Sequence, residues 1–305
     1  MSEELLINKI VQWNYPDEIL PKPFLKKYFN HIKKLLRDTK NYLSYEIHNG
    51  KIIKLVFANF RFEPVEMDRI NVMCFYIDKQ KLNIKMVKEE LRKLHEYFLP
   101  KKINLSLSTS VFETKLIKYF KNLGFVIKST KLKAQTSDSY LAISKMCLKP
   151  LPVYYSIDHM EYDKDIDAVM KIELRSHRNE PTSIVHNLPR KEFESFRYFL
   201  KELSLKKTVF VLKFNEKTIG VIAHNIRKNV SRNSTVTTVS IDPKFKGSGL
   251  SKYLYKTLVM DLKKKNVDEY YGYSSTKQVL RFAKILQRHP IRYSLVLEKK
   301  LLREL

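Results

Sequence analysis

Glycine is scarce in this chain, which contains only six glycines among its 305 residues. Two of them, Gly247 and Gly249, nevertheless lie close together in the segment SIDPKFKGSGLSKYLYK, residues 240–256. Glycine is favoured where the backbone needs a positive φ or where another group must approach it without a Cβ in the way. The pair therefore indicates either a tight structural turn or a place where bare backbone contacts a ligand.

Cysteine and long apolar runs are also scarce. Cys74 and Cys147 are the only cysteines, and a single pair without metal-ligand spacing predicts buried free thiols rather than a disulfide framework or a metal site. No run of about 18 apolar residues is present, so no transmembrane helix is predicted. The first residues, MSEELLINKIVQW, lack the basic and apolar regions of a secretory signal. We expect a soluble, cytoplasmic protein with no membrane span and no bound metal.

Acidic side chains are outnumbered, because 32 Asp and Glu residues stand against 58 Lys and Arg residues, for a formal net charge of +26. A charge of this size can attract a polyanion or an acidic ligand. It can equally belong to the solvated faces of a lysine-rich protein. The basic residues are spread along the chain without an arginine-rich tail, so both interpretations stay open.

The length of the chain favours two domains rather than one hydrophobic core. The segment LKPLPV, residues 148–153, contains two prolines, and such segments favour extended connectors. We therefore predict a first domain over residues 1–149 and a second over residues 150–305. The predicted elements follow a similar order on the two sides, which indicates an internal duplication.

Apolar periodicity and turn residues predict an α/β pattern in each half. The first half is predicted as helix 24–36, strands 42–47, 51–60 and 70–77, helix 86–98, strand 103–108, helix 113–123 and strands 125–134 and 140–146. The second half is predicted as strand 153–160, helices 163–176 and 190–203, two strands within 208–226, strand 234–242, helix 250–265, strand 268–275, helix 277–288 and strand 292–300. The first half has DKQKLNIK where the second has its glycine pair. A site made of bare backbone is therefore expected in the second half alone.

The glycine pair lies between the predicted strand that ends near Ile241 and the helix that begins near Leu250. The unpaired amides of such a loop and of the helix N-terminus, where the dipole is worth roughly half a positive charge, form an anion site. Lys244 and Lys246 add positive charge to it. The loop has neither the Gly-Lys-Ser/Thr ending of a Walker A loop nor the third glycine of a dinucleotide fingerprint.

The segment VSIDPKFKGSGLS resembles the acyl-CoA-binding segment of the GNAT acyltransferase superfamily. That family has an apolar strand, a proline and then Gln/Arg-x-x-Gly-x-Gly/Ala at the start of a helix. Pro243, Gly247 and Gly249 fit this pattern, and Lys244 stands where the family usually has Gln or Arg. The order of elements agrees over about residues 153–300. The first half is similar to the family through IKYFKNLGF (117–125), because the last helix of the family ends in Leu-Gly-Phe. The chain is thus identified as a tandem GNAT-like protein with a degenerate N-terminal half, which is either structural or on the acceptor side. Each domain is expected to be a mixed, mostly antiparallel sheet flanked by helices.

The resemblance implies how acetyl-CoA, or another acyl-CoA, is held. Amides from Lys246 to Ser251 would bind the pyrophosphate, and the backbone of the preceding strand would pair with the pantetheine arm. An amide of that strand would polarise the thioester carbonyl, and an amine would attack it directly. The implied acyl-CoA contacts are Val239, Ser240, Ile241, Lys244, Lys246, Gly247, Ser248, Gly249, Leu250, Ser251 and Ser275.

The catalytic groups are harder to assign, because Ala283 stands where many members of the family have a tyrosine that protonates the leaving thiolate. Thr276 also replaces the asparagine that often starts this segment. Tyr273, Ser274 and Ser275, at the end of the neighbouring strand, are the candidates for a replacement acid.

A base is also required to take a proton from the attacking amine. His224 is the candidate, because it lies on the predicted strand beside the acyl-CoA strand. Glu180 and His186 lie in the segment that covers the acceptor in this family, and they are the candidate acceptor contacts.

Three functions follow from these observations. The first is an N-acyltransferase that moves an acyl group, most simply acetyl, to an amine acceptor of unknown size. The second is a non-catalytic acyl-CoA-binding or regulatory protein, which the alanine at position 283 favours. The third is a transferase that acts with tRNA or another nucleic-acid partner, which the net charge favours.

Overall fold

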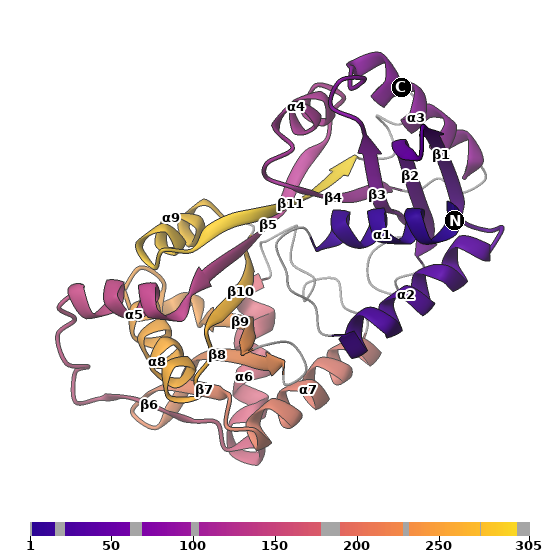
Figure 1. Ribbon diagram of the computed structural model, residues 1–305. Helices are drawn as coiled ribbons and strands as arrows, with labels where there is room; N and C mark the ends of the chain where they lie inside the picture. Colours follow the sequence, from indigo (N-terminus) through magenta and orange to yellow (C-terminus); the bar gives the residue numbers. More distant parts are fainter. Residues whose placement is uncertain are drawn as a thin grey trace. The chain divides into compact units, whose positions relative to one another are not determined.

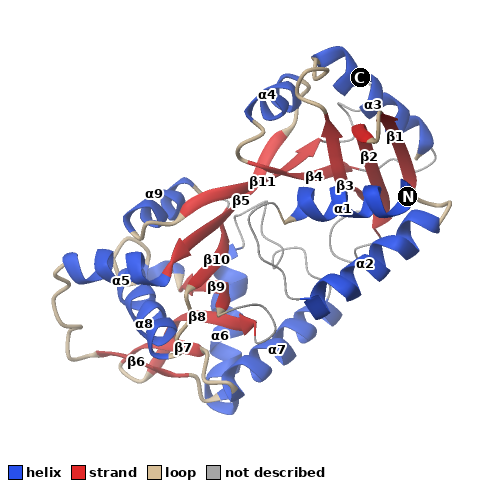
Figure 2. Cartoon of the chain, in the orientation of Figure 1, coloured by secondary structure: helices blue, strands red, loops and turns tan. Residues whose placement is uncertain are grey.

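The computed structural model describes residues 2–15, 22–61, 69–98, 104–177, 190–227, 232–274 and 276–297 (Figures 1 and 2). The chain forms two compact units. Unit 1 contains Met1–Lys131 together with Pro290–Leu305, and unit 2 contains Leu132–His289. Each unit has a mixed, mostly antiparallel sheet flanked by helices, which confirms the predicted fold class.

Unit 1 is built on strands in the order β1-β2-β3-β4-β11. Its elements are α1 (Ser2–Asn14), α2 (Lys22–Arg37), β1 (Tyr42–His48), β2 (Lys51–Arg61), β3 (Arg69–Ile77), α3 (Ile84–Tyr97), β4 (Asn104–Ser110), α4 (Thr114–Asn122) and, much later in the chain, β11 (His289–Leu297). The neighbours are antiparallel except β3 and β4, which pair in parallel from Arg69↔Asn104 to Val72↔Leu107. A parallel pair needs a crossover connection, and α3 provides it.

Unit 2 is built on strands in the order β10-β9-β8-β7-β6, with the second half of β5 (Val126–Gln135) next to β10. Its other elements are α5 (Thr136–Lys145), β6 (Tyr155–His159), α6 (Tyr162–His177), α7 (Arg190–Leu205), β7 (Val209–Phe214), β8 (Lys217–Arg227), β9 (Asn233–Ile241), α8 (Ser251–Lys264), β10 (Glu269–Ser274) and α9 (Lys277–Ile285). Strands β6 to β9 pair antiparallel in sequence, whereas β9 and β10 pair in parallel and are connected by α8.

Helices cover both faces of the sheet in unit 2. Val209 and Val211 of β7 lie in a core shared with α6 and α7, whereas Phe210 and Leu212 lie in a core shared with α8. Successive side chains of a strand point to opposite faces, so this alternation shows that β7 is buried on both sides. The neighbouring strand β8 is buried in the same way, with Val221 and Ala223 in the core of α6 and α7 and Ile222 in the core of α8.

The division between the units differs from the boundary expected between residues 149 and 150. The last strand, β11, pairs antiparallel with β4 of unit 1 from Arg292↔Ser110 to Leu297↔Leu105 (Figure 1). Conversely, Ala134 at the end of β5 lies in the hydrophobic core of unit 2. The prolines at 150 and 152 mark a connector inside unit 2, because partners distant in the sequence decide where the terminal strands pair.

Residues 140–146, predicted as a strand, are helical and belong mostly to α5. The buried residues of this helix are Thr136, Ser139 and Ile143, which recur at the spacing of one helix face. The Ser139 hydroxyl donates to the carbonyl of Leu286 at 2.6 Å and lies 2.8 Å from the Tyr270 hydroxyl. Tertiary contacts of this kind override the weak strand preference of a short segment.

The two cysteines differ. Cys74 is buried, as expected, and burial raises the pKa of its thiol. Cys147 is exposed, so its predicted burial was wrong.

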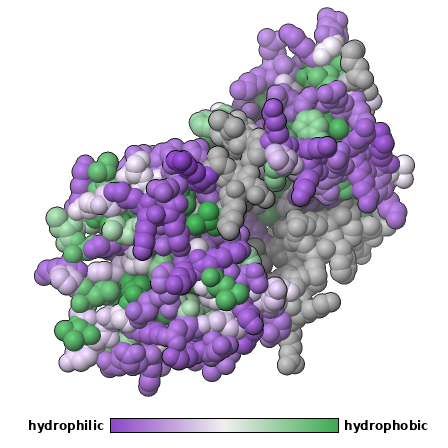
Figure 3. All heavy atoms as spheres, turned by 60° about the horizontal axis from the view of Figure 1, so that its bottom comes forward, coloured by the Kyte–Doolittle hydropathy of each residue, from purple (hydrophilic) through white to green (hydrophobic). Residues whose placement is uncertain are grey.

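In the part of the chain that the structure describes, no helix is long and apolar enough to cross a membrane. The face in Figure 3 is mostly hydrophilic, and its hydrophobic residues occur in small scattered groups.

Candidate functional site

The two parallel strands of unit 2 pair only where they begin. β10 and β9 are in register from Glu269↔Asn233 to Tyr271↔Thr235. β9 then continues to Ile241 and still pairs with β8 on its other side, up to Gly220↔Ile241. Among the described residues, no strand pairs with the other side of residues 236–241. We call this stretch the unpaired edge of β9.

The backbone groups along the unpaired edge follow from the register. The Asp242 amide donates to the Ile219 carbonyl at 2.7 Å, toward β8. Peptide groups of alternate residues point to the same side of an antiparallel strand. Those of Ser240 therefore face β8, and those of Val239 and Ile241 face away from it. The Ile241 carbonyl already accepts a bond from Ser176 of α6 at 2.8 Å, so Val239 offers the more complete pairing site for an added strand.

The loop after β9 has the bare backbone that the sequence predicted. It begins with one short 3-10 helix, Pro243–Phe245. Gly247 and Gly249 follow with φ of +83° and +78°, and a Cβ added to either would meet no atom within 4 Å. Both glycines are therefore favoured by backbone conformation, and the space beside them is open rather than filled by the protein.

Part of the expected row of amides is used by the loop itself. The Lys246 amide donates to the Pro243 carbonyl at 3.2 Å, and the Ser248 amide lies 3.4 Å from the Phe245 carbonyl. In the described ranges, the amides of Gly247, Gly249, Leu250 and Ser251 donate to no backbone carbonyl. The row expected from Lys246 to Ser251 is thus corrected to these four groups, with Ser248 held only by a long bond.

The N-terminus of α8 differs from that of its counterpart α3 in unit 1. In α3, the Asn83 side chain accepts a bond from the Met86 amide and caps the helix. In α8, the N-cap position is Leu250, which has no side-chain cap. Uncapped amides and the helix dipole attract an anion. That the second half alone carries such a site stays a prediction, because α4 of unit 1 also lacks a side-chain cap.

Positive charge surrounds the loop. Lys244 and Lys246 are exposed, and neither forms an ion pair with a carboxylate among the described residues. The one carboxylate in the loop, Asp242, is occupied: it accepts the Lys244 amide at 3.0 Å and pairs with Arg175 of α6 at 3.2 Å. Open glycines, free amides and two available lysines fit a diphosphate group.

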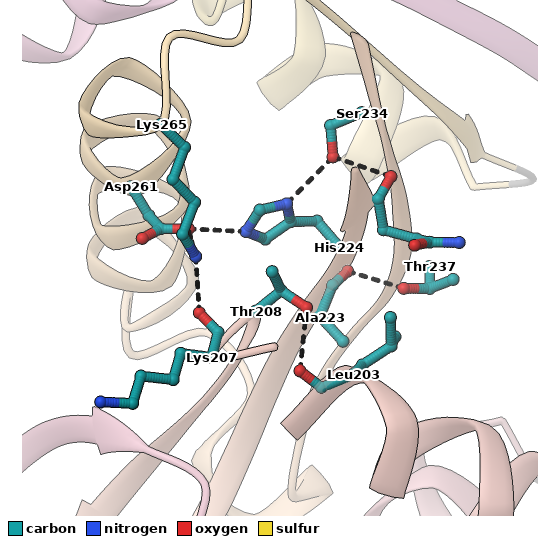
Figure 4. A network of polar contacts seen from close by, with 10 residues as sticks. Leu203, Lys207, Thr208, Ala223, His224, Ser234, Thr237, Asp261 and Lys265 are labelled. Atoms are coloured by element: carbon teal, nitrogen blue, oxygen red, sulfur yellow. Dashed lines mark hydrogen bonds and ion pairs between the residues drawn. The ribbon is translucent and has the colours of Figure 1, made fainter. Parts of the chain in front are cut away.

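His224 lies in a closed polar network beneath α8 (Figure 4). Its side chain is fully buried, with Nδ1 2.9 Å from the Ser234 hydroxyl and Nε2 2.8 Å from a carboxylate oxygen of Asp261. Asp261 also pairs with Lys265 at 2.7 Å, and the Lys265 ammonium donates to the Lys207 carbonyl at 2.6 Å. Every polar group of the imidazole is therefore occupied within the protein.

Burial dominates the electrostatics of this network. It lowers the pKa of the His224 imidazole below its ordinary value, and the bond to Asp261 only partly opposes this. Burial alone would raise the pKa of Asp261, but the bonds from His224 and Lys265 outweigh it and hold that pKa below its ordinary value. The geometry gives His224 a structural position without access to an acceptor, which is a correction to its expected role as the base.

The other predicted catalytic groups are only partly placed. Tyr273 is exposed, whereas the buried Ser274 hydroxyl donates to the Thr276 carbonyl at 3.4 Å. Thr276 itself caps α9 by accepting a bond from the Val279 amide at 3.3 Å. Ser275, Glu180 and His186 lie outside the described residues. Tyr273, Ser274 and Ser275 therefore stay predictions for the acid.

A buried glutamate beside the unpaired edge was missed by the sequence reasoning. Glu173 of α6 has no exposed surface, and it accepts a bond from the Thr238 hydroxyl of β9 at 2.7 Å. It belongs to the buried face of α6 with Ile166, Val169 and Met170. A carboxylate within an apolar helical stripe is the signal that could have identified it.

The end of α9 shows what replaced Leu-Gly-Phe in unit 2. Ala283 is buried. Gln287 has φ of +55°, the same left-handed region that Gly124 adopts at +89° after α4. The Arg288 amide donates to the Ala283 carbonyl at 2.9 Å, as the Phe125 amide does to the Phe120 carbonyl at 3.0 Å. The helix ending is therefore kept in unit 2 although its glycine and its phenylalanine are not.

We expect Gln287→Gly to raise the free energy of unfolding by about 0.5–1 kcal/mol, because a side chain in the left-handed region costs about 1–2 kcal/mol and glycine loses part of that gain through its freer unfolded state. Urea unfolding would measure the change. The reciprocal variant Gly124→Gln is the matched control, and it should lower stability. A gain from Gly124→Gln, or a loss from Gln287→Gly, would contradict the equivalence of the two helix endings.

No protein-family model and no curated protein matches this sequence. Solved structures do match over nearly the whole chain. A GCN5-related N-acetyltransferase from Sphaerobacter thermophilus has a TM-score of 0.66 at 9% identity, covering 98% of this chain and 93% of that one. A tandem GNAT protein from the clavulanic acid biosynthesis pathway has a TM-score of 0.57 at 9% identity, with 98% and 94% covered. A GNAT-family acetyltransferase from Colwellia psychrerythraea has a TM-score of 0.51 at 10% identity, with 97% and 95% covered.

These likenesses and the geometry of unit 2 define the class of fold: two α/β units, of which the second has a strand with an unpaired edge and an open loop at a helix N-terminus. This chain has the tandem GNAT fold, which the resemblance of residues 240–256 predicted.

Proposed function

We propose that unit 2 is an acyl-CoA-dependent N-acyltransferase that moves an acyl group, most simply acetyl, to an amine. The observation that carries this proposal is the uncapped N-terminus of α8, which is preceded by two open glycines with positive φ in the loop that follows the unpaired edge of β9. Backbone amides, a helix dipole and two lysines suit a diphosphate. An unpaired strand edge suits the amides of a pantetheine arm, which would add to the sheet as another strand.

Each part of the donor would then have its own protein groups. The amides of Gly247, Gly249, Leu250 and Ser251 would hold the diphosphate, together with the Lys244 and Lys246 side chains. The peptide groups of Val239 and Ile241 would pair with the pantetheine arm. In the reaction, the amine nitrogen bonds to the thioester carbon as the carbon–sulfur bond breaks. Coenzyme A leaves as a thiolate that takes up a proton, and the amine nitrogen releases one.

The proton released by the amine requires an acceptor. Glu173 is a buried carboxylate of α6 that contacts β9 within its unpaired edge, where it accepts a hydrogen bond from the Thr238 hydroxyl. We propose it in place of His224 because both side chains are fully buried, but Glu173 contacts the unpaired edge, whereas the polar partners of His224 are Ser234 and Asp261. The leaving thiolate needs little assistance, because thiols have a pKa of about 8.5.

A second candidate, a non-catalytic acyl-CoA-binding protein, is favoured by one observation. Ala283 is buried at the position where many GNAT enzymes have their acid, and it can transfer no proton.

Calorimetric titration with acetyl-CoA tests the site, and release of free thiol with a panel of amines tests the reaction. We expect binding with heat and acceptor-dependent thiol release. Binding of acetyl-CoA without thiol release in the presence of any amine would favour the non-catalytic protein. No binding of acetyl-CoA at all would overturn both candidate functions.

A further inference from the structure

A buried arginine lies directly after α9 in unit 2. Arg288 is 3% exposed. Among the described residues, no carboxylate pairs with it, and its buried Nε has no hydrogen-bond partner. Moving a cation out of water costs several kcal/mol unless the charge is paired. A negatively charged group that does not belong to the chain would compensate this buried charge.

The groups around Arg288 are polar but uncharged. Its Nη1 donates to the Tyr255 hydroxyl at 3.3 Å, and its guanidinium carbon lies 5.9 Å and 5.4 Å from the ring centres of Tyr255 and Tyr270. Burial raises the pKa of Tyr270 to about 12, so that phenol is neutral at pH 7. Two aromatic faces attract the cation, but they do not neutralise it.

The guanidinium lies where the unpaired edge of β9 begins. Gly272 is the β10 residue that follows the last pair, Tyr271↔Thr235. A Cβ built on Gly272 would collide with Nη2 of Arg288 and lie 3.4 Å from the Cβ of Val236, the first residue of the unpaired edge. The positive charge is therefore placed beside the point at which the two parallel strands stop pairing.

Unit 1 shows that the fold does not need this charge. Phe125 occupies the corresponding place after α4, with the same backbone bond to the preceding helix and the same 3% exposure. It packs against Phe120 with ring centres 4.9 Å apart, in the main core of unit 1. A buried aromatic ring is thus sufficient at this position. The arginine is found only in the unit that has the open loop.

We propose that Arg288 binds negative charge at the thioester end of the acyl donor. This proposal rests on the proposed function. The charge has two chemical sources: the sulfur of coenzyme A, which receives the electron pair of the broken carbon–sulfur bond and then takes a proton from water, or a carboxylate carried by the acyl chain. A guanidinium keeps its protons and acts on either as a hydrogen-bond donor with a fixed charge.

The test compares Arg288→Met and Arg288→Lys with the wild-type protein. Arg281→Met is the matched control, because Arg281 is an exposed arginine of α9. Ultraviolet absorbance of the thiolate follows the titration of bound coenzyme A, with the analogue lacking sulfur as the blank. Calorimetry measures the affinities for acetyl-CoA and succinyl-CoA. Thermal unfolding without ligand shows whether each variant folds, and Arg288→Lys keeps the test open if the methionine variant does not.

If the sulfur is the source, the thiol of coenzyme A bound to wild-type protein titrates at least about one pKa unit lower than free coenzyme A, as a nearby cation predicts. Arg288→Met removes this shift, and Arg281→Met keeps it. If an acyl carboxylate is the source, Arg288→Met lowers the affinity for succinyl-CoA at least about tenfold more than the affinity for acetyl-CoA.

An unchanged thiol titration together with an unchanged ratio of affinities in Arg288→Met would overturn the inference while leaving the proposed function intact. A wild-type protein that binds no coenzyme A would overturn the proposed function and this inference with it. A purely structural arginine predicts a third pattern, a large fall in melting temperature with no effect on either ligand measurement, and that pattern would also overturn it.

Discussion

Gly247→Glu is expected to weaken acetyl-CoA binding at least about 100-fold, which corresponds to roughly 2.7 kcal/mol. The new carboxylate would occupy the space beside the free amides of the loop and would repel the diphosphate, and like charges brought together cost several kcal/mol. The loop itself can hold the side chain, because a Cβ at Gly247 meets no atom within 4 Å. Calorimetric titration of the purified variant would measure the loss.

Gly50→Glu is the matched control for this variant. Gly50 lies in the turn between β1 and β2 of unit 1, with φ of +71° and no atom within 4 Å of an added Cβ. Both substitutions place glutamate in a left-handed conformation, so both should cost about 1–2 kcal/mol of stability. Only Gly247→Glu should lose the ligand. Equal heats of binding for the two variants would show that the diphosphate is held elsewhere.

Asp261→Ala is expected to lower the free energy of unfolding by about 2 kcal/mol, because it leaves the buried Nε2 of His224 without its charged hydrogen-bond acceptor. His224, which is fully buried, would lose the acceptor of its Nε2, and Lys265 would lose its ion pair. The Lys265 side chain is 27% exposed and can reach water, so most of the loss should come from His224. Urea unfolding would measure the change, and Asp138→Ala, at an exposed aspartate of α5, is the control.

The effect of Asp261→Ala should depend on pH with a definite sign. The pKa of Asp261 is lower in the folded protein than its ordinary value of 3.8. The folded state therefore favours the charged form, and the group contributes its stability above pH 3.8. That contribution is lost as pH falls through the lower, folded pKa. The difference between wild type and variant should thus be complete at neutral pH and shrink in acid. A difference that is the same at both would show that Asp261 acts by packing rather than by charge.

Local sequence predicted most of the elements because their signals are local. The run of β-branched residues before Asp242 predicts β9, and the pairing of glycine with positive φ predicts the loop at Gly247 and Gly249. Both signals depend only on the preferences of neighbouring residues. The segment 140–146 shows the limit of such signals. Its alternation indicates a strand, but contacts of Ser139 and Ile143 with distant parts of unit 2 hold it in a helix.

The candidate site was predicted in its backbone and not in its side chains. A loop of bare amides is encoded by adjacent residues, so its place was visible in the sequence. The enclosure of His224 by Asp261 and Ser234 was not, because these groups come from three different elements. Arg288 likewise takes its meaning from Gly272, Tyr255 and Tyr270, which no spacing in the sequence connects to it.

By itself, the order of residues determined that this chain has two similar α/β halves and that a loop with two open glycines precedes a helix in the second. Those features follow from hydrophobic periodicity and backbone preference, which act over a few residues. Tertiary structure alone decided that the final strand completes the first unit, that a histidine is closed off beneath α8 and that an arginine is buried at the start of the unpaired edge. These outcomes depend on pairing and burial between distant segments, and such contacts exist only once the chain has folded.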